Sequence, residues 1–154
     1  MKVIANNKKA RHDYFLEESY EAGIELKGNE VKSIRQGRVS IKESHVGDYK
    51  GELYIYNMNV SPYKESYDEN INPTRTRKLL LHKREIKKLI GKVSQAGYTI
   101  VVTKIYLKND LIKVEIALAK GKKLHDKRES IKRKDADRKI ERALKNYWYG
   151  IYRT

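Results

Sequence analysis

Two runs of residues, 98–107 and 111–118, constrain the fold of this chain more than any other feature. Both are rich in β-branched residues, and Asn109-Asp110 joins them. In the second run, apolar residues alternate with Lys113 and Glu115, which is the period of a strand with one buried face. The pattern predicts an antiparallel β-hairpin.

Earlier segments repeat this two-residue period. Residues 14–26 alternate most clearly at Ala22, Ile24 and Leu26, which predicts a half-buried strand. Residues 39–60 alternate twice, with breaks at Gly47-Asp48 and at a second glycine, and predict another hairpin.

Two short segments instead have helical spacing. Gly28 and Gly37 bracket NEVKSIRQ, and LLLHKREIKKLIGK has apolar residues at i, i+3 and i+4 with Gly91 as its expected stop. The polar residues 1–11 are expected to form an arm that packs only partly on the domain. Residues 61–76 contain both prolines and are expected to form a long loop.

Short antiparallel strands with two short helices and no βαβ rhythm favour a mainly β fold. We expect a sheet of five or six strands at this size to close so as to hide its edges. The prediction is therefore a closed antiparallel barrel resembling the OB-fold, with short flanking helices, over residues 1–118. OB-folds usually bind oligonucleotides, although a fold alone does not establish a function.

Residues 119–154 are predicted to form a separate basic tail. They contain 13 Lys and Arg against 5 Asp and Glu, which is +8 of the +15 carried by the whole chain. A narrow apolar stripe recurs at helical spacing between the charges. So little apolar area does not offset the ordering entropy, so the tail is expected to be disordered when free and helical when phosphates neutralise it. The alternative is a solvated tail without a specific role.

Composition excludes several classes of function. There are no cysteines, so disulfide frameworks and sulfur-based zinc sites are excluded, which fits a reducing cytoplasm. No apolar run approaches the length of a membrane span, and MKVIANNKKARH lacks the apolar segment of a secretory signal. The four histidines have no metal-ligand spacing, and there is no Gly-rich phosphate loop. We therefore expect no enzyme activity, no metal and no cofactor, and a nucleic-acid partner leads the alternatives for so basic a chain.

Three motifs occur in order along residues 7–145. They are NKKARHDYFLEESYEAGIELKGNEVKSIRQGRVSIKESHV, PTRTRKLLL, and GKKLHDKR followed by a charged run of helical character. Together they resemble the small protein B (SmpB) family, the bacterial partner of transfer-messenger RNA (tmRNA). The family's OB-like barrel and its tail, unstructured in free solution, agree with the pattern described above.

The resemblance implies ribosome rescue by trans-translation. The barrel would hold the tRNA-like domain of tmRNA and stand in for the missing anticodon arm. It would also promote aminoacylation by alanyl-tRNA synthetase and delivery by elongation factor Tu. The tail would enter the 16S rRNA decoding centre and the empty mRNA channel of a stalled ribosome, so that the nascent peptide is tagged. The protein itself would be a cytoplasmic monomer that catalyses nothing.

Family positions implicated in holding the tRNA-like RNA fall on Asn7, Glu21 and Leu80. Asn7 would donate and accept at an RNA edge, and Leu80 would pack on a base or ribose. Because phosphate repels a carboxylate, Glu21 is expected to accept from a base amine or 2′-hydroxyl, or to orient a neighbouring Arg or Lys. The alternative interpretation is that Glu21 is an ordinary exposed strand residue that pairs with a lysine.

Basic residues in loops and at strand ends are the expected phosphate contacts, although some of them are expected to be merely solvated. They are Lys8, Lys9, Arg11, Arg75, Arg77, Lys78, Lys120, Lys122 and Lys123.

In the tail, His125 matches the family's decoding-centre residue, whose ring would stack on a ribosomal base. The expected anchors around it and further along are Asp126, Lys127, Arg128, Arg133, Lys134, Arg138 and Arg142.

Two features depart from the family pattern. Lys134 stands where the family's Arg is expected, which keeps the charge and loses bidentate geometry. The ending NYWYGIYRT is more aromatic than expected and would either stack on RNA or pack on the barrel.

Three other readings stay open. The strongest is a generic basic ribosomal or ribosome-assembly protein with an OB-fold. A ribonuclease that uses His12 and His125 as acid and base is a weaker alternative. A membrane-surface role fits poorly, because the apolar stripe of the tail is narrow.

Overall fold

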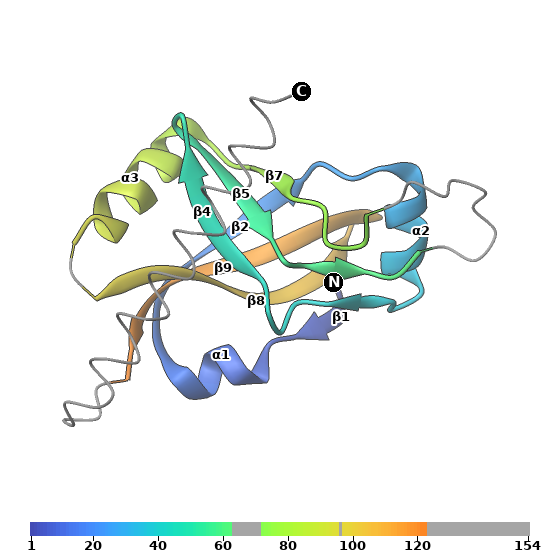
Figure 1. The fold of residues 1–154 in the computed structure, drawn as a ribbon, viewed down its shortest axis with the longest axis horizontal. Coiled ribbons are helices and arrows are strands. Elements are labelled where there is room, and N and C mark those ends of the chain that lie inside the picture. The colour runs from blue at the N-terminus through green and yellow to red at the C-terminus, as the bar shows by residue number, and fades with distance from the viewer. Residues whose placement is uncertain (63–71, 96, 123–154) are drawn as a thin grey trace. The chain divides into compact units, whose positions relative to one another are not determined.

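The computed structural model describes residues 1–62, 72–95 and 97–122 (Figure 1). The strands are β1 (Lys2–Asn6), β2 (Tyr14–Ile24), β3 (Val39–Ser40), β4 (His45–Tyr49), β5 (Glu52–Tyr56), β6 (Asn59–Val60), β7 (Arg77–Leu80), β8 (Tyr98–Lys108) and β9 (Leu111–Gly121). The helices are α1 (Lys8–Asp13), α2 (Gly28–Arg35) and α3 (Lys83–Val93).

Seven of the strands form one antiparallel sheet in the order β1-β8-β9-β2-β7-β5-β4, and β3 pairs with β6 in a small second sheet. The fully buried apolar residues come from strands on both sides of β2 and from α2 and α3, so the sheet and two helices share one core. Its largest fully buried apolar members are Ile34, Leu53, Ile55, Met58, Leu79, Leu89, Ile105, Ile116 and Leu118.

The predicted hairpin of β8 and β9 is confirmed. The two strands have 11 residues each and are paired from Lys108 and Leu111 at the turn to Tyr98 and Lys120 at the far end. Both residues of the turn, Asn109-Asp110, have positive φ angles, 51° and 62°. Such a turn matches the twist of the strands it connects, which is why it closes a long, regular hairpin.

The predicted closed barrel is wrong. β1 and β4 are the two edges of the large sheet, and no ladder joins them in the part of the chain that the structure describes. The sheet nevertheless curls enough to bring β4 near β8. We expected closure because open edges promote aggregation, but both edge strands have only five residues and so present few unpaired backbone groups.

The amino-terminal residues are more ordered than the predicted arm. Residues 2–6 form β1, which pairs with β8, and α1 follows directly. Asn7 caps α1, since its side chain accepts the backbone N–H of Ala10 at 3.1 Å. The segment therefore belongs to the sheet and its flank.

Both other predicted helices are confirmed. α2 is followed by Gly37, whose φ of 77° explains the glycine there. Gly91 does not stop α3, which continues to Val93 with Ser94 as its C-cap. The β4–β5 hairpin is also confirmed. Its turn, Lys50-Gly51, contains the second predicted break, Gly51, whereas the first, Gly47-Asp48, lies inside β4.

The division between residues 118 and 119 stays a prediction. β9 continues through Gly121, and residues 1–121 form one compact unit. Residues 123–154, which include most of the predicted tail, lie outside the described residues.

Candidate RNA interface

One face of the large sheet points away from the core. On β9, Val114 and Ile116 are fully buried in the core, so Glu115 between them points to the opposite side, which we call the outer face. The register places Glu21 of β2 directly opposite Glu115. Residues of four neighbouring strands share this face: Lys104, Tyr106 and Lys108 of β8, Lys113 and Glu115 of β9, Glu21 and Gly23 of β2, and Lys78 and Leu80 of β7.

The carboxylate of Glu21 is held by two residues of β8. The Tyr106 hydroxyl donates to Oε1 of Glu21 at 2.6 Å, and Lys108 Nζ lies 3.4 Å from the carboxylate. The hydrogen bond from Tyr106 holds the pKa of Glu21 below its usual value. Tyr106 is only 4% exposed, and this burial raises the pKa of its phenol. The phenol is thus a fixed donor that orients an ionised, accessible carboxylate.

A second carboxylate lies beside the first. Like charges directly opposite on neighbouring strands destabilise a sheet, so Glu21 and Glu115 each need a partner. Glu115 accepts the hydroxyl of Thr103, and Lys104 Nζ lies 3.9 Å from its Oε1. The outer face therefore presents two acids that are each paired with a basic side chain.

Leu80 lies on the same face, next to Glu21. β7 pairs with β2 so that Leu80 is opposite Gly23, two residues from Glu21. A Cβ at Gly23 would come within 3.2 Å of the Leu80 Cβ, so the glycine makes room for this side chain. Leu80 is 46% exposed. The structure thus brings together two predicted site residues that come from separate motifs.

Lys78, a predicted phosphate contact, shares this face two residues before Leu80 on β7. Its Nζ is 3.9 Å from Oε2 of Glu52, and its side chain is about one-third exposed. It extends the line of lysines along the outer face.

The structure places Asn7, a predicted RNA contact, inside the fold. Its side chain is buried, and its amide nitrogen donates to the carbonyls of Val102 at 2.9 Å and Ile41 at 3.3 Å. Its oxygen accepts from Ala10, so both amide groups are used inside the fold. Asn7 fixes α1 to β8 and presents no edge to a partner.

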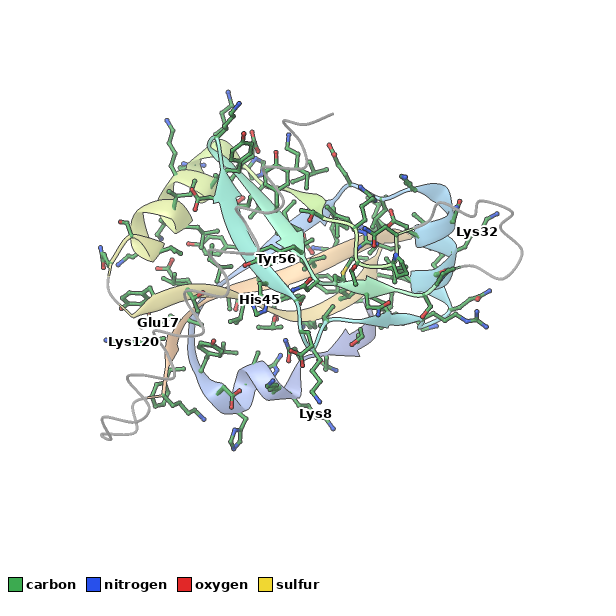
Figure 2. The ribbon with its side chains drawn as sticks, viewed as in Figure 1. Lys8, Glu17, Lys32, His45, Tyr56 and Lys120 are labelled. Carbon is green, nitrogen blue, oxygen red and sulfur yellow. The ribbon has the colours of Figure 1, made fainter. Side chains whose placement is uncertain are left out.

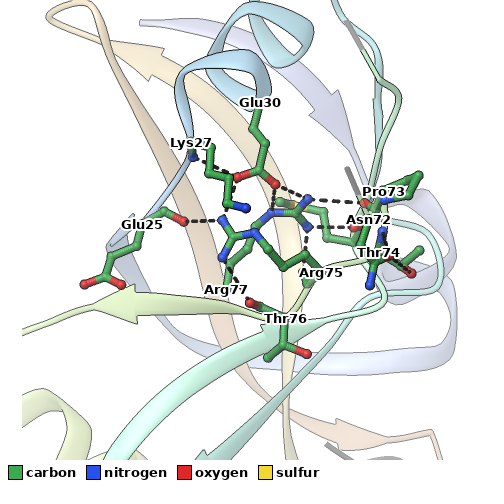
Figure 3. Close-up of polar contacts among 10 residues, drawn as sticks. Glu25, Lys27, Glu30, Asn72, Pro73, Thr74, Arg75, Thr76 and Arg77 are labelled. Atoms are coloured by element: carbon green, nitrogen blue, oxygen red, sulfur yellow. Dashed lines mark hydrogen bonds and ion pairs between the residues drawn. The ribbon is translucent and has the colours of Figure 1, made fainter. Parts of the chain in front are cut away.

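Arg77, a predicted phosphate contact, also lies inside the fold. It is 1% exposed, and its guanidinium forms an ion pair with Glu30 and donates to the carbonyls of Met58, Arg75 and Pro73 (Figure 3). Its neighbour Arg75 donates to Oε1 of Glu30 at 2.6 Å and keeps a side chain 30% exposed.

Glu30 is the centre of this buried cluster. Burial raises the pKa of Glu30, but hydrogen bonds from Arg75, from the backbone N–H of Lys27 and from Arg77 outweigh it and hold the pKa below its usual value. Glu30 also caps α2 through that backbone bond, 2.8 Å long. The cluster ties the start of α2 to β7 and the turn before it.

The other described basic residues lie apart from the outer face. Lys8, Lys9 and Arg11 are exposed on α1, where Lys9 lies 3.7 Å from Glu43. Lys120 and Lys122 lie at the end of β9, and Figure 2 shows Lys120 near Glu17 and away from Lys8. Lys123 and the predicted tail residues from His125 to Arg142 lie outside the described residues.

Sequence reasoning missed four residues that organise these sites. Glu115 lies in the recognised hairpin, where alternation with apolar residues marked it as solvent-facing, and Tyr106 and Lys108 lie on the other strand of that hairpin. Their link to Glu21 depends on strand order, which no local pattern gives. Glu30 could have been found from its place at the third position of a predicted helix, where an acid caps the helix, together with the basic motif PTRTRK as a source of ion-pair partners.

Clusters of metal ligands and membrane-spanning helices are both absent from the described ranges. Within residues 1–62, 72–95 and 97–122, no group of three or more His, Asp and Glu side chains is placed to hold a metal ion. No helix in the same part of the chain is long and apolar enough to cross a membrane.

Comparison with known proteins identifies the family. The family described as "SmpB protein" matches residues 4–146. A protein of Geobacillus thermodenitrificans named "SsrA-binding protein" is 59% identical over 144 residues, which cover 94% of this chain and 93% of the relative. One of the same name from Halothermothrix orenii is 59% identical over 145 residues, covering 94% of each chain.

A solved structure agrees with these relatives. It is described as "tmRNA-SmpB: a journey to the center of the bacterial ribosome", and its chain is 48% identical with a TM-score of 0.67. The match covers 82% of this chain and 89% of that chain. The chain belongs to the SmpB family.

Proposed function

We propose that this chain is an RNA-binding protein of trans-translation that binds the tRNA-like domain of tmRNA through the outer face of its sheet. The observation that carries the proposal is the placement of Glu21 and Leu80 side by side on one exposed face, framed by lysines. Family membership, the names of the relatives and the tmRNA–SmpB structure support it.

The outer face combines attraction with selection. Lys78, Lys104, Lys108 and Lys113 supply positive charge for phosphates, which gives affinity with little sequence information. A fixed carboxylate repels phosphate and accepts only from donors, such as a base amine or a 2′-hydroxyl. Glu21 therefore admits RNA only in positions that present a donor to it.

The remaining steps follow from the family resemblance. The bound protein stands in for the anticodon arm, and alanyl-tRNA synthetase and elongation factor Tu act on the complex through tmRNA. The tail, with His125 at the decoding centre and its basic residues along the 16S rRNA and the mRNA channel, places the RNA on a stalled ribosome. The protein acts as a cytoplasmic monomer and catalyses no reaction.

Substitutions on the outer face test the proposal. Glu21→Ala and Leu80→Ala should each weaken binding to the isolated tRNA-like domain about tenfold, the loss expected for one good contact. Glu18→Ala is the matched control, because Glu18 is on the same strand and is held by a tyrosine and a lysine in the same way. Equal effects at Glu18 and Glu21 would place the RNA elsewhere.

A generic ribosomal or assembly protein is the second candidate, favoured by the net charge of +15. Such a protein would copurify with all ribosomes at fixed stoichiometry. A rescue factor is substoichiometric and enriched on stalled ribosomes. The amount of this protein per ribosome, measured in fractions of stalled and of translating ribosomes, therefore separates the two.

A further inference from the structure

Three side chains form a row across the sheet at the end of β2 away from Glu21. The register pairs Tyr98 of β8 with Lys120 of β9, and Lys120 in turn with Phe15 of β2. Directly paired residues on neighbouring strands share a face. Tyr98, Lys120 and Phe15 are therefore consecutive neighbours, and we call them the aromatic row.

The row has one fixed ring, one cation and one exposed ring. Tyr98 packs against the core, and its hydroxyl lies 3.4 Å from Oε1 of Glu17. Lys120 Nζ is 5.6 Å from the centroid of the Tyr98 ring, within the range of a cation–π contact. Phe15 is 58% exposed, and it is the one phenylalanine of the chain.

The aromatic row is separate from the interface built on Glu21. Five positions separate Glu115 from Lys120 on the regular strand β9, so these two side chains point to opposite faces. Along β9, the five positions from Glu115, opposite Glu21, to Lys120, opposite Phe15, span about 17 Å at the usual rise of a strand. One nucleotide therefore does not reach both places.

We propose that the aromatic row is a second RNA site, in which one unpaired base stacks on Phe15 while Lys120 contacts a neighbouring phosphate. The inference deepens the proposed function and rests on it. An exposed aromatic ring beside a lysine is the combination used by proteins that hold single-stranded nucleic acid. Bases within a duplex do not offer a free face, so the partner is a loop, bulge or strand end.

Charge around the row fits the same partner. Arg11 is exposed in α1, which leads directly into β2. The unpaired base has two possible sources, a loop of the tRNA-like RNA and the ribosomal RNA of a stalled ribosome. The chemistry of recognition is the same for both.

Substitutions of Phe15 in the full chain test the site, with binding measured to the isolated tRNA-like domain in one arm and, as the tmRNA complex, to stalled ribosomes in the other. F15A and F15L should weaken binding about threefold to thirtyfold in at least one arm, because stacking on one base contributes roughly 1–3 kcal/mol. F15W should retain binding.

The arm that responds identifies the source of the base. Unchanged binding of F15A in both arms, or full binding by F15L, would overturn the stacking site. The wild-type protein tests the proposed function separately. If it bound RNA in neither arm, the proposed function would be refuted, and the stacking site would not be the cause.

Fluorescence gives a readout that a structural role would not change. Trp148 is the single tryptophan of the chain, so F15W in a W148F background carries its only indole on the row. RNA should quench this indole. An indole at position 15 that RNA leaves unquenched would also overturn the proposal.

Discussion

Tyr106 and Glu21 show how one buried phenol prepares a surface group. Tyr106 is buried on the outer face, yet its hydroxyl reaches across β9 to a carboxylate on β2. A preset carboxylate loses little freedom when it binds, which is the general advantage of preorganisation. We therefore expect the phenol to contribute to RNA binding without touching RNA.

Tyr106→Phe should reduce affinity for the tRNA-like domain about threefold to tenfold, the equivalent of one lost hydrogen bond. The ring stays in place, so the change removes only the hydroxyl. Tyr20→Phe is the matched control, because the Tyr20 hydroxyl donates to Glu18 at the same distance, 2.6 Å. Binding measured by titration should fall for the first variant only.

A double-mutant cycle and a pH titration make this prediction specific. In a Glu21→Gln background, Tyr106→Phe should add little further loss, because the two residues act as a unit. Followed by carboxyl chemical shifts, the pKa of Glu21 should rise in Tyr106→Phe and stay constant in Tyr20→Phe. Additive losses of affinity would contradict the positioning role.

Single residues show where sequence reasoning succeeds and where it stops. The family resemblance selected Glu21 and Leu80, and the structure places both on one face. The resemblance also selected Asn7, and the clustering of basic residues in loops and at strand ends selected Arg77, but both side chains are buried. Their burial depends on partners 34 to 95 residues away along the chain, and no local pattern records such partners.

The start of α2 is anchored by a buried ion pair. Glu30 has the same third position in α2 that Glu85 has in α3, and both carboxylates accept a backbone N–H of the preceding turn. Only Glu30 is also bound to Arg75 and Arg77. The two helices thus form an internal comparison between a cap alone and a cap with an ion pair.

Glu30→Gln should lower the free energy of unfolding by about 3 kcal/mol, because it leaves the buried Arg77 charge without its counter-charge. Glu85→Gln should cost under about 1 kcal/mol, the range of a helix cap. Urea unfolding followed by circular dichroism measures both. Equal costs would mean that the ion pair contributes nothing beyond the cap.

The ion pair of Glu30 with Arg75 and Arg77 also predicts how the stability of the fold depends on pH. The pKa of Glu30 is lowered in the folded protein, so its contribution to stability is fully present above the unfolded value of about 4.3 and is lost as pH falls through the folded value. The stability difference between wild type and Glu30→Gln should be constant from pH 7 to 5 and shrink below pH 4. A difference that grows in acid would contradict this assignment.

Elements with local signals were predicted correctly. The β8–β9 hairpin, β2, α2 and α3 each carry their period and their turn residues within one segment. β1 was missed because its order comes from pairing with β8, about 100 residues later. Gly91 failed as a stop because it keeps a right-handed backbone inside α3.

At the level of the whole chain, closure of the sheet was the main error. Local patterns predicted the strands and their antiparallel character. The order of the strands, and whether the two edge strands pair with each other, depend on long-range pairing. The charge distribution, by contrast, follows directly from the sequence. It predicts strong dependence of RNA binding on salt, because released counterions favour association.

Truncation tests the division between sheet and tail. A chain that ends after Lys122 keeps all of β9 and the outer face. It should bind the tRNA-like domain nearly as well as the full chain and fail to tag stalled nascent peptides in a reconstituted translation assay. A large loss of affinity for the isolated RNA would assign the tail a direct part in tmRNA binding.

Selective binding of tmRNA is tested most directly by a titration of the full chain against its tRNA-like domain at near-physiological salt, with ordinary tRNA as competitor. Low salt would hide the answer, because a basic protein then binds any RNA. The outer-face interface predicts tight binding that tRNA does not displace and that Glu21→Ala weakens. Equal affinity for both RNAs, unaffected by Glu21→Ala, would contradict it.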